Sequence, residues 1–195
     1  MRKVTAVLFI IVMIFVFSNS LLADDFRSVN WGMSKQQVKE NEDAELYEEE
    51  EKILFYETSL KDYDFLLGYF FQDDKLFRTK YVMLESFYND NKYLNVKDEF
   101  LKILRDKYGT TDGDMHAYWT NDLYKGDYED YGTAVGLGHL SYFYKWNTDK
   151  ADIWLGLTGD GNFNITFGIE YVSTEYSHLA DKYQEEEQNK TSDNL

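Results

Sequence analysis

Three histidines are the first candidates for chemistry in this 195-residue sequence. His116, His139 and His178 lie in separate segments, and no pair of them has the spacing of a zinc-binding motif such as HExxH. A single histidine near the end of a strand is most often a hydrogen-bonded structural residue. We therefore interpret all three as structural and expect no histidine-based metal site.

Carboxylates are far more numerous, but their spacing does not match a known cation site. The twelve-residue calcium loop requires alternating ligands, a central glycine and a terminal glutamate, and no acidic group fits this pattern. Weak calcium binding at surface carboxylates remains as an alternative. A glycosidase is a further alternative. It needs two carboxylates across a cleft, and sequence spacing does not determine which carboxylates lie close together in space. The acidic residues considered for these sites are Glu48 to Glu51, Asp112 with Asp114, Asp127 with Glu129 and Asp130, Asp160, and Glu185 to Glu187.

Neither a nucleotide site nor thiol chemistry is predicted. The glycine-rich segment 132–138 is followed by His139, where a phosphate-binding loop needs Lys and then Ser or Thr. We interpret this segment as a flexible loop between strands. The chain has no cysteine, which excludes disulfides, thiolate metal sites and a cysteine nucleophile. We therefore expect no catalytic residues, no metal and no cofactor.

The net charge narrows the classes of partner. Asp and Glu number 36 against 20 Lys and Arg, so the formal net charge is −16. Phosphate backbones and anionic lipid headgroups would repel such a chain. We expect no nucleic-acid partner, and a protein partner with a basic surface is the better fit.

The N-terminal residues have the order of a secretory signal peptide. Arg2 and Lys3 precede the apolar segment 4–17, and small residues up to Ala23 follow. We expect residues 1–23 to be the signal peptide, with cleavage after Ala23 or, alternatively, after Ser20. The protein would then be secreted or periplasmic. The other alternative is an uncleaved anchor, because the segment 4–23 has about the length of a membrane span; otherwise no stable membrane anchoring is expected.

The segment that follows contains a readable helix start. Ser34 and Gln37 have the spacing of a capping box, and Met33 and Val38 flank it as a hydrophobic staple. A helix is predicted over 35–42, and strands over 53–58, 65–71 and 75–84. We assign residues 24–90 to a first unit of one helix and an antiparallel meander.

The second unit, residues 91–180, repeats this order. Asn95 is a candidate N-cap for a helix that ends at Gly109, and strands are predicted over 115–120, 140–146, 151–158 and 163–172. The predicted fold class is α+β, with two tandem helix-plus-antiparallel-meander (αβββ) units and the helices packed on one face of the sheet. Residues 181–195 are polar and acidic, and we expect an acidic disordered tail.

The segment 31–38, WGMSKQQV, resembles the opening of two families of small exported α/β modules. These are the outer-membrane assembly lipoprotein BamE (SmpA/OmlA) and the β-lactamase-inhibitor-protein-like fold. The resemblance implies helices against one face of an antiparallel sheet, and binding to other proteins rather than catalysis. The chain departs from the assembly lipoprotein because it has no cysteine to carry a lipid, and its tandem arrangement fits the inhibitor-like architecture better.

Two aromatic side chains are predicted on polar strand faces. Phe143 alternates onto one face with Ser141 and Lys145, and Trp154 alternates with Asp152 and Gly156. Aromatic anchors among polar neighbours are typical of protein-binding surfaces. We therefore name Phe143, Trp154 and Asp152 as candidate partner-binding residues. The alternative is that the segment 127–138 folds over this face and buries the two rings.

The sequence thus favours an exported, non-enzymatic binding protein that recognises another protein in the bacterial periplasm or at the cell exterior. The first alternative is an envelope hydrolase or carbohydrate-binding protein that uses surface carboxylates and aromatic rings. The second is a purely structural secreted protein whose acidity serves solubility.

Overall fold

The structure, a computed structural model, describes residues 24–111 and 116–193. The predicted signal peptide, residues 1–23, lies outside the described residues. Within the described ranges, none of the helices combines the length and the apolar character that crossing a bilayer requires.

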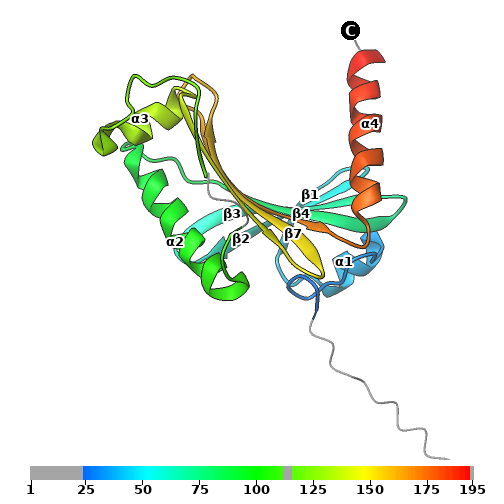
Figure 1. Ribbon diagram of the computed structural model, residues 1–195. Helices are drawn as coiled ribbons and strands as arrows, with labels where there is room; N and C mark the ends of the chain where they lie inside the picture. The colour runs from blue at the N-terminus through cyan, green and yellow to red at the C-terminus, as the bar shows by residue number, and fades with distance from the viewer. Residues whose placement is uncertain (1–23, 112–115, 194–195) are drawn as a thin grey trace, which may run out of the picture.

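One antiparallel sheet of eight strands forms the centre of the fold (Figure 1). Its strand order is β1-β2-β3-β4-β8-β7-β6-β5, so the first four strands and the last four each form a meander. The strands are β1 (Glu45–Glu49), β2 (Ile53–Leu60), β3 (Tyr63–Gln72), β4 (Lys75–Met83), β5 (Ala117–Trp119), β6 (Leu140–Asn147), β7 (Ala151–Gly159) and β8 (Ile165–Ser173).

The two meanders are joined edge to edge by β4 and β8. These strands pair antiparallel, with Tyr81 opposite Ile169 and Lys80 opposite Glu170. The prediction of two tandem αβββ units is therefore wrong, because the strands of both halves belong to one continuous sheet. The first half has four strands where three were predicted, and the second half has the four that were predicted. The pairing of β4 with β8 joins strands that are far apart in the sequence, and no local sequence pattern indicates it. The prediction therefore treated the two meanders as separate units.

The helices lie on both faces of the sheet, so the prediction of a single helix-packed face is also wrong. We call the face that carries α2 and α3 the inner face, and the opposite one, against which α4 packs, the outer face (Figure 1). The helices are α1 (Lys35–Asn41), α2 (Asn91–Tyr108), α3 (Tyr131–Gly136) and α4 (Ser177–Asp193), with a short 3₁₀ turn, η1 (Tyr128–Asp130), before α3.

Helix α4 includes residues 181–193 of the segment 181–195, for which we expected a disordered tail; residues 194–195 lie outside the described residues. Its first turns are held by Leu179 and Tyr183, which are buried against Phe70 and Phe77 on the outer face. Its remaining residues are mostly good helix formers. Lys182 also forms an ion pair of 2.7 Å with Asp73 in the β3–β4 turn. The polar and acidic composition of this segment is typical of disorder. In the structure, the buried side chains of Leu179 and Tyr183 and the ion pair of Lys182 hold the helix on the sheet.

The inner face carries the main hydrophobic core. Alternate residues of the central strands point into it, so β7 is buried at Ile153, Leu155 and Leu157 and half-exposed between them. The predicted capping box of α1 is present, because the Ser34 side chain accepts from the Gln37 amide and the Gln37 side chain accepts from the Ser34 amide. Both observations follow directly from local sequence patterns.

Two helical segments differ from the prediction. Helix α2 begins at Asn91, one turn before the expected N-cap Asn95, because Tyr93 and Leu94 extend its buried side. The predicted glycine-rich loop contains α3, whose Gly132 lies so close to the backbone at Asn91 that an added Cβ would come within 2.4 Å of it. The glycine there permits close helix packing rather than loop flexibility.

A buried ion pair connects the N-terminal segment and α1 to the sheet. The Glu42 carboxylate, which is fully buried, accepts hydrogen bonds from Arg27 Nη2 at 2.9 Å, from the Ala44 amide at 2.9 Å and from the Tyr69 hydroxyl. Burial, followed by the hydrogen bond to Glu42, raises the pKa of Tyr69. Burial acts to lower the pKa of Arg27, but hydrogen bonding to Tyr81 and the charge of Glu42 leave that pKa raised. Both groups therefore keep their protons at neutral pH.

Candidate functional site

The outer face is covered in one half of the sheet and open in the other. Helix α4 lies over β3 and β4 through Phe70 and Phe77. The segment 127–138, named above as the alternative cover of this face, packs instead on the inner face, where Ala134 and Val135 of α3 are buried in the main core. Within the described residues, no helix therefore covers the outer surface of β6 and β7 or that of β8 from Thr166 to Glu170.

Phe143 of β6 and Trp154 of β7 lie on this open surface, as their alternation predicts. Each is 40% exposed, which is high for large aromatic side chains in the middle of a sheet. The ring of Tyr118, on the edge strand β5, contacts the Phe143 ring edge-on at 5.8 Å. The three rings form an aromatic row across neighbouring strands.

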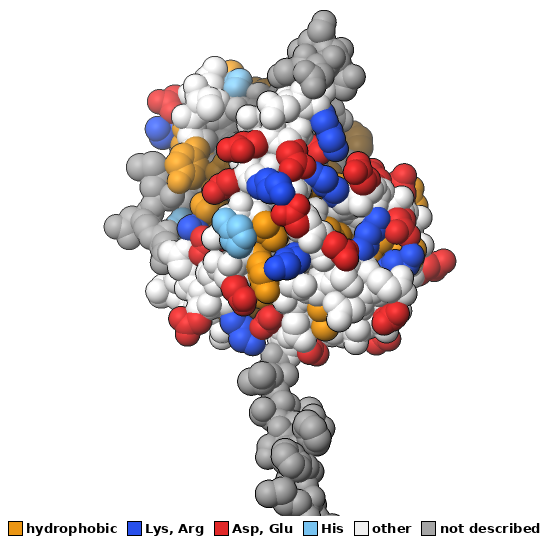
Figure 2. All heavy atoms as spheres, turned by 90° about the vertical axis from the view of Figure 1, so that its right-hand side faces the viewer, with side chains coloured by type: hydrophobic (Ala, Val, Ile, Leu, Met, Phe, Trp, Pro, Cys, Tyr) orange, Lys and Arg blue, Asp and Glu red, His pale blue; other side chains and the backbone are white. Residues whose placement is uncertain are grey.

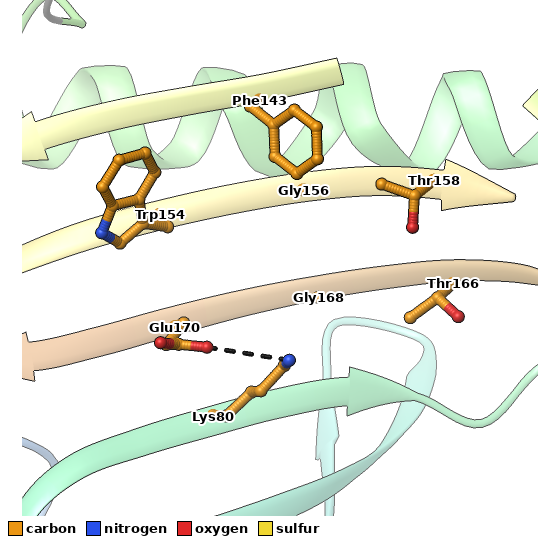
Figure 3. A pocket seen from close by; sticks show the side chains of 8 residues that line it. All are labelled: Lys80, Phe143, Trp154, Gly156, Thr158, Thr166, Gly168 and Glu170. Carbon is orange, nitrogen blue, oxygen red and sulfur yellow. Dashed lines mark ion pairs between the residues drawn. The ribbon is translucent and has the colours of Figure 1, made fainter. Parts of the chain in front are cut away.

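A hollow of about 300 Å³ lies beside the aromatic row (Figure 3). Its floor is formed by Gly156 of β7 and Gly168 of β8, which are directly opposite each other in the sheet. Because neither residue has a side chain, the surface is lowered between the taller neighbours. The complete lining consists of Lys80, Phe143, Trp154, Gly156, Thr158, Thr166, Gly168 and Glu170.

The two glycines differ in how much room surrounds them. A Cβ at Gly156 would lie 3.5 Å from the Phe143 ring, an ordinary contact distance, whereas a Cβ at Gly168 would come within 2.9 Å of the Tyr81 carbonyl oxygen. Gly168 is thus required for the close approach of β4 and β8. Packing therefore does not require a glycine at position 156. The glycine there keeps the hollow open but does not improve the packing of the sheet.

Paired charges border the hollow and the aromatic row. Lys80 Nζ lies 3.7 Å from a carboxylate oxygen of Glu170 (Figure 3), and Lys145 Nζ lies 3.0 Å from one of Asp152. Lys145 Nζ also lies 4.9 Å from the centroid of the Trp154 ring, within the range of a cation–π contact. The surface is therefore apolar at its centre and formally neutral at its border.

Charge on the side of the molecule that carries α4 is mixed rather than concentrated. Figure 2 shows acidic side chains spread over this side and interleaved with basic ones. Lys182 pairs with Asp73 at 2.7 Å, and Lys52 pairs with Glu186. The excess of negative charge is a property of the whole protein, and it does not form a single acidic site here.

The groups that a hydrolase or a metal site would need do not converge at the hollow. Glu170 is the one carboxylate in its lining, whereas a glycosidase uses two. In the part of the chain that the structure describes, no three His, Asp or Glu side chains are placed to hold a metal ion. The three histidines lie apart from one another, against Tyr144, Tyr124 and Tyr176 respectively.

The structure brings two of the three predicted site residues to the hollow. Phe143 and Trp154 line it, while Asp152 lies at the border of the surface, paired with Lys145. The prediction did not include Gly156 and Gly168, which form the floor. Glycine inside a strand signals a close approach or an open surface, and that signal was present at both positions. What the sequence lacked was the register that places them side by side.

Comparisons with protein families, with curated proteins and with solved structures found no match to this chain. The resemblance of the segment 31–38 to two families of exported modules therefore stays a prediction.

Proposed function

We propose that this protein is an exported, non-enzymatic binding module that recognises another protein through the open half of its outer face. One observation carries the proposal: Phe143 and Trp154 stand 40% exposed beside a hollow whose floor is two adjacent glycines. Large rings around a recess are the arrangement that binding hot spots use, because an inserted side chain is desolvated on several sides at once.

The hollow favours an apolar anchor from the partner. Its floor is peptide backbone and the rings of Phe143 and Trp154 form one side, so a leucine, methionine or aromatic side chain would bury apolar surface there. Thr158 and Thr166, which also line the hollow, offer hydroxyl groups for hydrogen bonds at its border. An apolar centre surrounded by a polar rim is typical of protein–protein interfaces.

Around this anchor, the partner is expected to be basic. The chain carries a net charge of −16, and a field of this sign attracts cationic surfaces and repels anionic ones. The effect acts chiefly on the association rate and on the choice of partner. Raising the salt concentration should therefore slow association more than it speeds dissociation.

A double substitution of the two rings tests the proposal. The Phe143→Ala/Trp154→Ala variant should lose at least about 30-fold in affinity for the partner, because truncating a hot-spot side chain costs about 2 kcal/mol or more. The measurement is quantitative affinity capture of envelope proteins on the immobilised protein, comparing wild type with the variant, followed by titration of each captured protein after purification.

The matched control is Tyr88→Ala/Leu123→Ala. Tyr88 and Leu123 are exposed large side chains that lie in loops and do not line the hollow, at 107% and 70% exposure. This control should bind like wild type. Equal recovery of every captured protein by wild type and by the Phe143/Trp154 variant would refute the proposed surface.

A further inference from the structure

A second recess lies on the inner face, away from the proposed partner surface. This crevice, of about 630 Å³, is formed between α2, the N-terminal segment and the β2–β3 turn, above the junction of β4 and β8. Its volume falls within the range of small-molecule sites, which commonly occupy the junction of two structural halves. Figure 1 shows α1 and α2 standing apart on this face.

Apolar and aromatic side chains form most of the crevice. Both strands of the junction contribute, as do α2 and the N-terminal segment, and the residues used here are Phe26, Tyr81, Phe100, Ile103, Ile169 and Tyr171. Tyr81 and Tyr171 place hydroxyl groups among this apolar surface. An occupant with an apolar body would therefore be desolvated along most of its length.

Cations gather at this crevice although the protein as a whole is strongly acidic. Arg27, Lys61 and Lys107 all belong to its lining. Arg27 is paired with Glu42, but neither Lys61 nor Lys107 forms an ion pair with another described residue. Among the described residues, these two lysines are therefore charges without a carboxylate partner, although Lys107 Nζ lies 4.8 Å from the centroid of the Tyr108 ring.

Two acidic residues also line the crevice, and one of them is neutralised. Asp25 is paired with Lys150 at 2.6 Å and accepts a hydrogen bond from the Trp31 amide at 3.1 Å. Asp24 accepts from the Asn30 side-chain amide at 3.3 Å. Among the described residues that line the crevice, the charges without an ion-pair partner are two lysines and one aspartate, and this balance favours an anion.

We propose that the crevice binds a small organic anion with an apolar body, its acid group placed between Lys61 and Lys107 and its body against the β4–β8 junction. Arg27 and the Tyr81 hydroxyl extend the polar end of the site. This binding activity is independent of the proposed protein partner, because the two recesses lie on opposite faces of the sheet.

Isothermal titration of the full chain with decanoate tests the proposal, and anilinonaphthalene sulfonate serves as the aryl counterpart of this acyl probe. Two control ligands have the same ten-carbon alkyl group: decanol is uncharged, and decyltrimethylammonium carries a positive charge. We expect decanoate to bind at least about tenfold more tightly than either of them, since a charge-assisted contact contributes about that factor. A stronger response to the aryl probe would identify an aromatic acid as the natural class, and a stronger response to decanoate an acyl acid.

Charge reversal separates this site from general electrostatics. Lys61→Glu/Lys107→Glu should weaken decanoate binding at least about tenfold. Lys75→Glu/Lys92→Glu, which changes net charge equally at exposed positions outside the crevice, should leave it unchanged. Ile103→Trp, which fills the crevice from α2, should also weaken it, with thermal unfolding confirming that each variant is folded. Equal affinity for decanol, or no effect of the Lys61/Lys107 reversal, would overturn the proposal.

Discussion

Replacing Gly156 with valine is expected to abolish partner binding while leaving the fold intact. The new side chain would project from β7 into the hollow between Phe143 and Trp154, where a Cβ has ordinary contact distances. It would occupy the space that the partner's anchor needs, so affinity should fall at least about 30-fold. Valine also suits a strand better than glycine does, so stability should stay the same or rise by up to about 1 kcal/mol.

A graded series provides the control for this prediction. Gly156→Ala fills less of the hollow and should give an intermediate loss of affinity at unchanged stability. Affinity is measured by titration against the captured partner, and stability by urea unfolding. Full binding by Gly156→Val would show that the hollow is not where the partner inserts, even if the aromatic rings contribute.

Removing the carboxylate of Glu42 is expected to cause a large loss of stability. Glu42→Ala would leave Arg27 and the Tyr69 hydroxyl without their acceptor in a buried environment, together with the Ala44 amide. Breaking a buried pair by removing one partner costs about 3–5 kcal/mol. Because the Arg27 side chain is 28% exposed, we expect the low end, about 3 kcal/mol, in the free energy of unfolding measured with urea.

The comparison variant for Glu42 is Glu40→Ala, a change of the same type at an exposed position of α1, the helix that Glu42 caps. It should alter stability by no more than about 0.5 kcal/mol. A loss below about 1 kcal/mol for Glu42→Ala would mean that water replaces the carboxylate, and that the pair does not fasten α1 to the sheet.

The candidate site was predictable where it depends on local alternation. Strand periodicity places Phe143 and Trp154 on the outer surface whatever the tertiary structure is, because successive side chains of a strand point to opposite faces. The same reasoning could not decide whether another segment covers them. That depended on α3, whose glycine-rich sequence resembles a loop and whose helix exists through packing against α2.

Features that depend on distant pairing were beyond sequence reasoning. The hollow requires Gly156 and Gly168 to be in register, and the single sheet requires β4 to pair with β8. The acidic edge strand β1 escaped prediction because all five of its residues are exposed and no buried alternation marks it. The Arg27–Glu42 ion pair was not predicted, because the sequence does not show which of the 36 acidic residues is buried.

Site-specific photo-crosslinking in the producing cells tests the proposed partner surface most directly. A photoreactive amino acid at Thr166, an exposed position of the hollow, should form a covalent product with one discrete protein. The same group at Lys102, on the exposed side of α2 with 76% of its side chain accessible, should not. Adding Gly156→Val should remove the Thr166 product. The same product from both positions, or no product at Thr166, would contradict the outer face as the site of partner recognition. A Thr166 product that persists with Gly156→Val would contradict insertion of the partner into the hollow.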